Sequence, residues 1–134
     1  MKLKSAIAIF FAGFVATSFT LRLNDQKPWP VPDAAKNKKN AVANNAESVA
    51  AGKLLWNTHC KSCHGGKGLG DGTKAAQLKT EPGDFSKATF QSQTDGSIFY
   101  KLSEGREDMP SFKKKIPDED DRWSLVNFIR SLKK

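Results

Sequence analysis

The apolar residues of this chain form one unbroken block at the N-terminus and three later stretches with helical spacing. The N-terminal block runs from Ser5 to Leu21, and its only interruptions are small hydroxyl residues and Gly13. Lys2 and Lys4 precede it. A positive start followed by an apolar core is typical of an export signal, and the block is also close to the length of a single membrane anchor. We therefore predict that residues 1–21 are a signal peptide or an N-terminal membrane anchor, and that the rest of the chain is exported.

Residues 22–45 have no apolar periodicity. Prolines alternate at positions 28, 30 and 32, a pattern that favours extended chain, and a Lys/Asn/Ala run follows. We predict that this segment is a linker. Lys36, Lys38 and Lys39 are expected to be a solvated tether, since no aromatic or repetitive pattern accompanies them to indicate nucleic-acid binding.

The first helical stretch begins after Asn45, a suitable N-cap, and is predicted to run from Ala46 to about Cys60. One face of this helix carries residues spaced three or four apart: Val49, Gly52, Trp56 and Cys60. Gly52 has no side chain, so it would allow another helix to approach closely.

Two further helices are predicted downstream. Thr94 can cap a helix from Asp95 to about Ser103, with Gly105 just after its end. Asp118 can cap the last helix, whose acidic start suits a helix N-terminus. The apolar stripe of this last helix is formed by Leu125, Phe128, Ile129 and Leu132. A short helical segment at 73–78 is also possible. No convincing strand pattern is present, so the predicted class is all-α.

Composition adds an excess of basic residues, but most of it lies outside the helical part. The 134 residues include 22 Lys and Arg and 14 Asp and Glu, for a net charge of +8. The segment 46–134 has 15 basic and 12 acidic residues and is therefore only mildly basic, at +3. We predict that this segment is one compact domain.

Both cysteines of the chain lie in Cys60-Lys61-Ser62-Cys63-His64. C-x-x-C-H is the attachment signature of c-type haem, in which two thiols on about one helical turn reach one porphyrin and the following histidine ligates the iron. A structural zinc site would need further ligands, and the only other histidine, His59, is beside Cys60. A dithiol redox site would need a βαβ setting, which the pattern lacks, and a disulfide here would close very little chain. The sequence therefore predicts one covalent haem c, held by Cys60 and Cys63 and ligated by His64.

Met109 is the predicted second axial ligand. Met1 and Met109 are the only methionines, so Met109 is the one thioether in the domain. It is followed by Pro110 and surrounded by charged residues instead of an apolar stripe, which argues against a packing role. A thioether sulfur opposite a histidine raises the reduction potential of haem iron.

These features together resemble class I cytochrome c, over about residues 46–134. The resemblance rests on C-x-x-C-H, on Met109-Pro110 downstream and on two terminal helices that cross near a glycine and an aromatic residue. It implies the cytochrome c fold, with three or four helices around one haem. The family also places a proline carbonyl against the N–H of the ligating histidine, and Pro82 is the nearest candidate here.

We therefore expect an electron-transfer protein of a respiratory or periplasmic redox chain, and not an enzyme. The alternative is a haem enzyme or gas-binding module, peroxidase-like, which requires that Met109 does not bind. The partners are expected to be redox proteins, and an acidic partner is predicted to meet a ring of lysines. This predicted ring is formed by Lys61, Lys67, Lys113, Lys114 and Lys115. The N-terminus provides a possible membrane tether, and no nucleic acid is expected.

Overall fold

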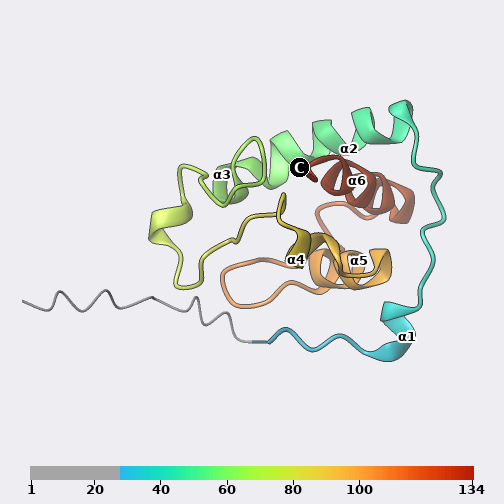
Figure 1. Cartoon of the computed structure of the whole chain (residues 1–134), viewed down its shortest axis with the longest axis horizontal. Helices are drawn as coiled ribbons and strands as arrows, with labels where there is room; N and C mark the ends of the chain where they lie inside the picture. The colour runs from blue at the N-terminus through green and yellow to red at the C-terminus, as the bar shows by residue number, and fades with distance from the viewer. Residues whose placement is uncertain (1–27) are drawn as a thin grey trace, which may run out of the picture.

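The computed structural model describes residues 28–134, which contain six α-helices, one 3₁₀ helix and no strand (Figure 1). The prediction of an all-α fold is thus confirmed for this part of the chain. The predicted signal or anchor at 1–21 lies outside the described residues. Within residues 28–134, no helix has the length and apolar character needed to cross a membrane.

Three helices form the body of the molecule: α2 (Ala46–His59), α5 (Asp95–Glu104) and α6 (Glu119–Ser131). Their predicted N-caps are confirmed. The Asn45 and Ser48 side chains each bond the other residue's backbone N–H, forming a capping box, while Thr94 accepts from Ser97 N at 3.1 Å and Asp118 from Asp120 N at 2.8 Å. Capping satisfies backbone donors that a helix leaves open at its start, so these side chains fix where each helix begins.

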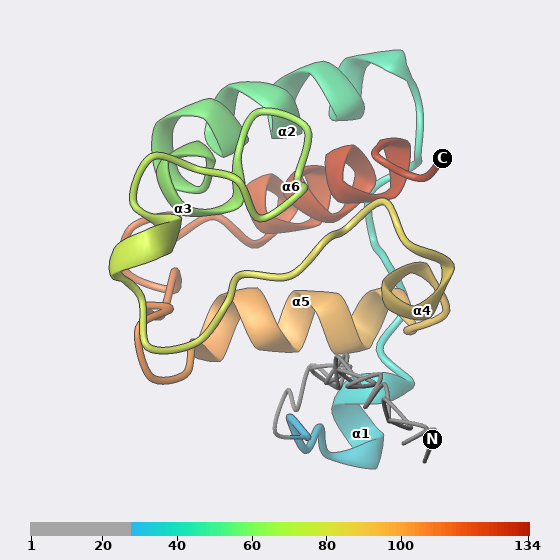
Figure 2. The same ribbon diagram turned by 60° about the vertical axis from the view of Figure 1, so that its left-hand side comes forward.

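The helices α2 and α6 make the principal contact of the fold, and α6 in turn packs on α5 (Figure 2). Gly52 of α2 lies against α6 so closely that a Cβ atom built on it would be 2.1 Å from the Ser124 carbonyl oxygen. The predicted close helix approach at Gly52 is thus confirmed. Trp56, one turn further along α2, is almost fully buried beside Phe128, with ring centroids 5.5 Å apart.

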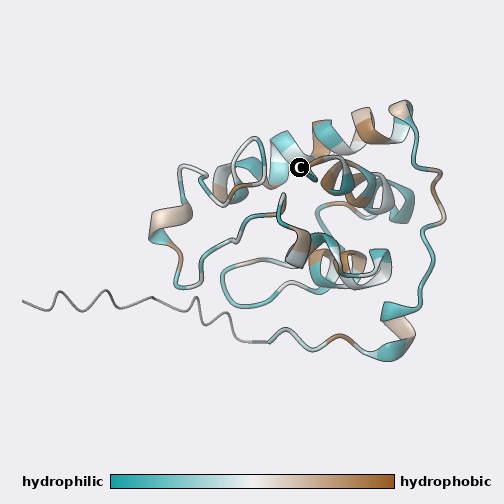
Figure 3. Ribbon diagram, in the orientation of Figure 1, coloured by the Kyte–Doolittle hydropathy of each residue, from teal (hydrophilic) through white to brown (hydrophobic). Residues whose placement is uncertain are grey.

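Helix α6 differs from the single apolar stripe that its sequence predicts. Every residue from Arg122 to Ile129 is buried, because α6 is sandwiched between α2 and α5. Trp123 is fully buried and stacks on Phe99 of α5 at 3.9 Å between ring centroids. In Figure 3 the hydrophobic parts of α5 and α6 lie toward the centre of the molecule, while the long loops are mostly polar.

Short helices complete the fold between these three. One turn, α3 (Lys61–His64), follows α2 directly, and the 3₁₀ helix η1 (Ala75–Gln77) lies within the predicted short segment 73–78. The short helix α4 (Ala88–Gln91) precedes α5 and was not indicated by the sequence pattern.

Residues 28–45, which we call the N-terminal strap, lie against the domain. The strap contains α1 (Asp33–Lys36), which packs beside α5. Lys38 forms an ion pair with Glu119 at 2.6 Å, and Asn40 donates to Asn127 Oδ1 at 2.7 Å. Lys38 therefore differs from the solvated tether that we expected. The division of the chain at residue 45 stays a prediction.

Candidate functional site: a pocket for haem

The C-x-x-C-H residues lie on a continuous turn at the end of α2. Cys60 caps α2, donating its N–H to Trp56 O at 2.9 Å, and its own carbonyl accepts from His64 N at 2.9 Å and Cys63 N at 3.1 Å. Gly65, with φ +79°, then ends α3 in a conformation that favours glycine. Both cysteines are free thiols. Before haem is attached, burial and, to a smaller extent, the Cys63 side chain raise the pKa of the Cys60 thiol to about 12.

His64 is held between aromatic rings. Its ring centroid is 4.6 Å from that of Phe85 and 5.7 Å from that of Trp56, whose Nε1 donates to Gly65 O at 3.0 Å. Burial lowers the pKa of His64 to about 4, and the Pro82 carbonyl acts in the opposite direction. The imidazole is therefore neutral at physiological pH, the form that binds a metal.

The Nδ1 atom of His64 is buried and forms no hydrogen bond with the described residues. The Pro82 carbonyl, which is the candidate predicted from the sequence, is close enough to raise the pKa of His64 against the larger effect of burial. A hydrogen bond from a ligating histidine to a carbonyl orients the ring and raises its basicity. The role of Pro82 as the partner of His64 stays a prediction.

Met109 lies in a tight loop after α5. Arg106 and Met109 exchange two backbone hydrogen bonds, of 2.8 and 2.9 Å, around Glu107 at φ +52°. The loop is tied back to α5 by Ser111 Oγ, which donates to Ser103 O at 2.6 Å. These bonds fix the Met109 backbone relative to α5.

The loop is also tied across to the 79–80 segment. Asp108 accepts from Lys79 N at 2.6 Å, and Glu107 accepts from Thr80 Oγ1 at 2.7 Å. The acidic neighbours of Met109 are thus directed to another loop. The Met109 side chain itself packs against the hydrophobic core.

All four predicted site residues, Cys60, Cys63, His64 and Met109, line one cavity of about 510 Å³. This size lies within the range of about 300–1,000 Å³ that is usual for cofactor pockets. Apolar side chains complete much of its wall: Phe85, Phe90, Ile98, Leu102, Phe112 and Ile129.

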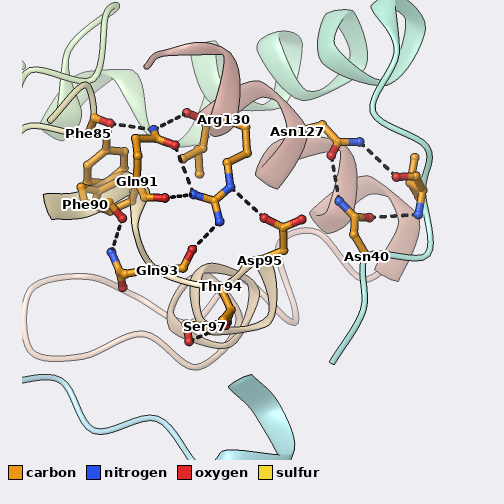
Figure 4. Close-up of polar contacts among 12 residues, drawn as sticks. Asn40, Phe85, Phe90, Gln91, Gln93, Thr94, Asp95, Ser97, Asn127 and Arg130 are labelled. Carbon is orange, nitrogen blue, oxygen red and sulfur yellow. Dashed lines mark hydrogen bonds and ion pairs between the residues drawn. The ribbon is translucent and has the colours of Figure 1, made fainter. Parts of the chain in front are cut away.

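A network around Arg130 of α6 holds one wall of this cavity (Figure 4). The Arg130 guanidinium donates to Asp95 Oδ1 at 2.7 Å and to Gln91 O at 2.8 Å. Gln91 in turn donates to Phe85 O at 2.7 Å, and the Phe85 ring stacks on Phe90 at 4.1 Å between centroids. Phe85, which packs against His64, is therefore held in place through Gln91 by a hydrogen-bonded arginine on the last helix.

These residues fit a covalently attached haem. Two cysteine side chains, a half-buried neutral imidazole and a thioether share one largely apolar cavity of suitable size. Within the described part of the chain, no group of three or more His, Cys, Asp or Glu residues is arranged to hold a metal ion by itself.

Sequence reasoning missed several residues of the cavity. Pro28 and Trp29 of the strap line it, together with Lys101 and Arg106. Trp29 could have indicated that the linker contacts the domain, because a large aromatic side chain is seldom fully exposed to solvent. The stacking of Phe85 on Phe90 could not be predicted in this way, because neither residue lies in a predicted helix.

Comparisons with known proteins agree with this geometry. Residues 47–129, more than half of the chain, match the family described as cytochrome c oxidase, cbb3-type, subunit III. No curated protein matches the sequence significantly.

The solved structures that are similar to the chain include the following two. One belongs to the Kuenenia stuttgartiensis reducing HAO-like protein complex Kustc0457/Kustc0458, with 26% identity and a TM-score of 0.66 over 81% of this chain. This chain spans about half, 52%, of that protein's length. The other is the KustC0563 c-type cytochrome, with 29% identity and a TM-score of 0.52, covering 62% of this chain and 98% of that one.

The turn at Cys60–His64, the cavity and the family match lead to one conclusion: this chain belongs to the family of c-type cytochrome domains described as cytochrome c oxidase, cbb3-type, subunit III, whose cofactor is covalently bound haem c.

Proposed function

We propose that this protein is a one-electron carrier whose haem is attached through Cys60 and Cys63 and ligated by His64 and Met109. The observation that carries the proposal is that the motif and the single methionine of the described residues, 45 positions apart, line the same cavity. The carrier acts in a respiratory or periplasmic redox chain and is not itself an enzyme.

The residues of the cavity suit this task. When bound, the haem iron supplies the one-electron oxidation and reduction. His64 provides a neutral nitrogen fixed by Phe85 and Trp56, and Met109 provides a soft sulfur that favours the reduced metal and so raises the potential. If His64 and Met109 both bound the iron, no position on it would be left open for a substrate. The packed aromatic wall and the tied Met109 loop limit movement between the two oxidation states, which favours fast electron exchange.

The competing function is a haem enzyme or gas-binding module with an open or labile position opposite His64. The similar chain from an HAO-like complex gives this alternative a specific basis. Carbon monoxide distinguishes the two functions. We expect the ferrous holoprotein to bind CO poorly at neutral pH, and the ferric form to show the methionine-to-iron absorption band. Rapid CO binding without that band would favour the enzyme or gas-binding function.

Gly105 is expected to set the position of Met109. It has φ +73°, and a Cβ atom there would lie 2.5 Å from Met109 O and from the Pro110 and Ser111 backbone. The substitution Gly105→Ala should therefore displace the loop and weaken the Met109–iron bond. We expect the methionine-to-iron band to disappear at a lower denaturant concentration than in the parent protein.

The matched control for Gly105→Ala is Gly66→Ala. Gly66 lies in the loop after the motif, where a Cβ atom would meet only Lys61 Cε, at 3.7 Å. Equal loss of the band in both variants would show that Gly105 has no special relation to Met109.

We further propose that the partners are redox proteins and that an acidic partner docks against the predicted lysine ring. All five lysines are exposed. Lys113 is also paired with Glu104 at 2.5 Å, and Lys115 lies over the Phe112 ring. None of the five ring lysines lines the cavity. In this proposal the lysines supply positive charge outside the cavity, and Glu104 partly neutralises the charge of Lys113.

Electrostatic steering predicts a dependence on salt. Opposite charges accelerate encounter at low ionic strength, and the acceleration falls as the Debye length shortens. We expect the bimolecular electron-transfer rate with an acidic partner protein to fall as salt rises, and to fall less in a Lys61→Gln, Lys114→Gln variant. A rate independent of salt would remove the steering proposal.

The proposed location is the periplasm, either soluble or anchored to the outer face of the cytoplasmic membrane. This proposal rests on the sequence of residues 1–21. It also rests on the fact that bacteria attach c-type haem outside the cytoplasmic membrane, so the chain must be exported first. The intact mass of the holoprotein, purified from a host that matures c-type haem, would report both N-terminal cleavage and the attached porphyrin.

A further inference from the structure

Arg130, near the end of α6, joins this helix to the junction of α4 and α5. Its Nε donates to Asp95 Oδ1 at 2.7 Å and its Nη2 to Gln93 O at 2.5 Å, while Nη1 donates to Gln91 O at 2.8 Å and to Gln91 Oε1 at 3.1 Å. In Figure 4 the guanidinium lies among these three residues. Only 20% of the Arg130 side chain is exposed. A guanidinium has enough donors for all four acceptors, whereas a lysine ammonium has three.

Gln91 extends these bonds from Arg130 to the segment before α4. Its side-chain nitrogen donates to Phe85 O at 2.7 Å. Because Arg130 binds the amide oxygen of Gln91, the amide keeps the orientation in which its nitrogen faces Phe85. Phe90, the residue before Gln91, stacks on the Phe85 ring with centroids 4.1 Å apart. Two adjacent residues of α4 therefore hold Phe85, one by its carbonyl and the other by its ring.

Phe85 in turn forms part of the surroundings of the His64 imidazole. The two ring centroids are 4.6 Å apart, and Phe85 N donates at 2.7 Å to Gly68 O, in the loop that follows the haem motif. Pro82 lies only three residues before Phe85. Burial lowers the pKa of His64, and the Pro82 carbonyl opposes this effect. A displacement of Phe85 would therefore move both the ring and the carbonyl that act on His64.

We propose that Arg130 is a positioning residue for the haem ligand His64. It acts through Gln91, which holds Phe85 against the imidazole and thereby fixes the plane of that ring. Neither Arg130 nor Gln91 is among the residues that line the cavity, so their influence on the imidazole passes through Phe85. This inference rests on the proposed function, because it requires that His64 is an iron ligand.

The test removes single links of this chain of contacts in the mature holoprotein. Gln91→Met removes the amide without changing the net charge, and Arg130→Met removes the guanidinium but keeps an apolar side chain. The readout is the set of proton NMR shifts of the haem methyl groups in the ferric protein, because their pattern depends on the plane of the axial imidazole. The methionine-to-iron band and Tm are recorded for every variant.

We expect Gln91→Met and Arg130→Met to change the pattern of methyl shifts in the same way. Arg130→Lys should change it less, since its ammonium can keep some of the bonds. Phe85→Leu should also change the pattern. If Arg130 acts through Phe85, Arg130→Met should cause little further change in a protein that already carries Phe85→Leu, because the effects of coupled residues do not add.

Two controls separate positioning from charge and from stability. Lys133→Gln removes an exposed positive charge three residues after Arg130 and should leave the methyl shifts unchanged. Asn45→Ala removes the N-cap of α2, so it should lower Tm without changing the methyl shifts. A change that Gln91→Met shows and neither control shows is therefore specific to the contacts that lead to His64.

Methyl shifts of Gln91→Met equal to those of the parent would overturn the inference, as would additive changes from Arg130→Met and Phe85→Leu. If Arg130→Met fails to mature, Gln91→Met and Arg130→Lys decide the outcome. A parent with the methionine-to-iron band and a Gln91→Met protein with unchanged shifts would leave the proposed function standing while this inference fails. A parent without the band would contradict the proposed function, and the methyl shifts would still show whether Arg130 positions His64.

Discussion

Replacing Cys60 and Cys63 together by alanine is expected to leave a largely unfolded chain without haem. Core side chains line the cavity of about 510 Å³. Without porphyrin in the cavity, these side chains lose the apolar surface against which they pack. Each 100 Å² of apolar surface that the porphyrin covers contributes about 2.5 kcal/mol. Several such patches equal the whole stability of a small domain, about 5–15 kcal/mol.

Far-UV circular dichroism of the double variant, expressed in a host that matures c-type haem, measures this loss. Ser62→Ala is the control, because Ser62 is an exposed residue between the two cysteines and its replacement leaves both thiols intact. Intact mass confirms which samples carry porphyrin. A haem-free double variant with the helicity of the parent would show that the protein core is stable by itself.

Gly52→Ala is expected to destabilise the holoprotein strongly. Its Cβ atom would lie 2.1 Å from Ser124 O and 2.9 Å from Phe128 Cβ, and a backbone carbonyl within α6 cannot move aside alone. The overpacking that separates α2 from α6 lowers the free energy of unfolding by about 3 kcal/mol. The higher helix propensity of alanine raises it by about 1 kcal/mol. A net loss of about 2 kcal/mol corresponds to a fall in Tm of roughly 8–16 °C in a domain of this size.

Thermal unfolding followed by circular dichroism measures the Gly52 effect, and Gly66→Ala again serves as the control. Gly66 has open space around it and no positive φ, so its replacement should change Tm little. If both variants melted at the parent temperature, the close contact between α2 and α6 would not be required for stability.

The sequence predicted the features that depend on local chemistry. The caps at Asn45, Thr94 and Asp118 are short-range hydrogen bonds, so a single sequence reveals them. The close helix contact at Gly52 followed from its place on an apolar helix face. The motif and Met109 indicated a shared site because the chemistry of haem demands those residue types.

The features that were missed depend on contacts between distant segments. In the sequence, Arg130 is an ordinary basic residue near the end of a helix. Its partners Gln91 and Asp95 lie 35 or more positions away and can be identified only in the folded chain. The strap has the proline and lysine content of a solvated linker. It is bound instead through Asn40 and Lys38 to residues more than 80 positions away.

The most direct measurement of the central claim is the ferric absorption spectrum and reduction potential of Met109→Ala beside those of the parent holoprotein. If Met109 is the sulfur ligand opposite His64, the substitution abolishes the methionine-to-iron band and lowers the potential, because a ligand that favours ferrous iron is lost. A Met109→Ala protein with the parent's spectrum and potential would show that this sulfur does not bind the iron, and the proposed carrier function would be contradicted.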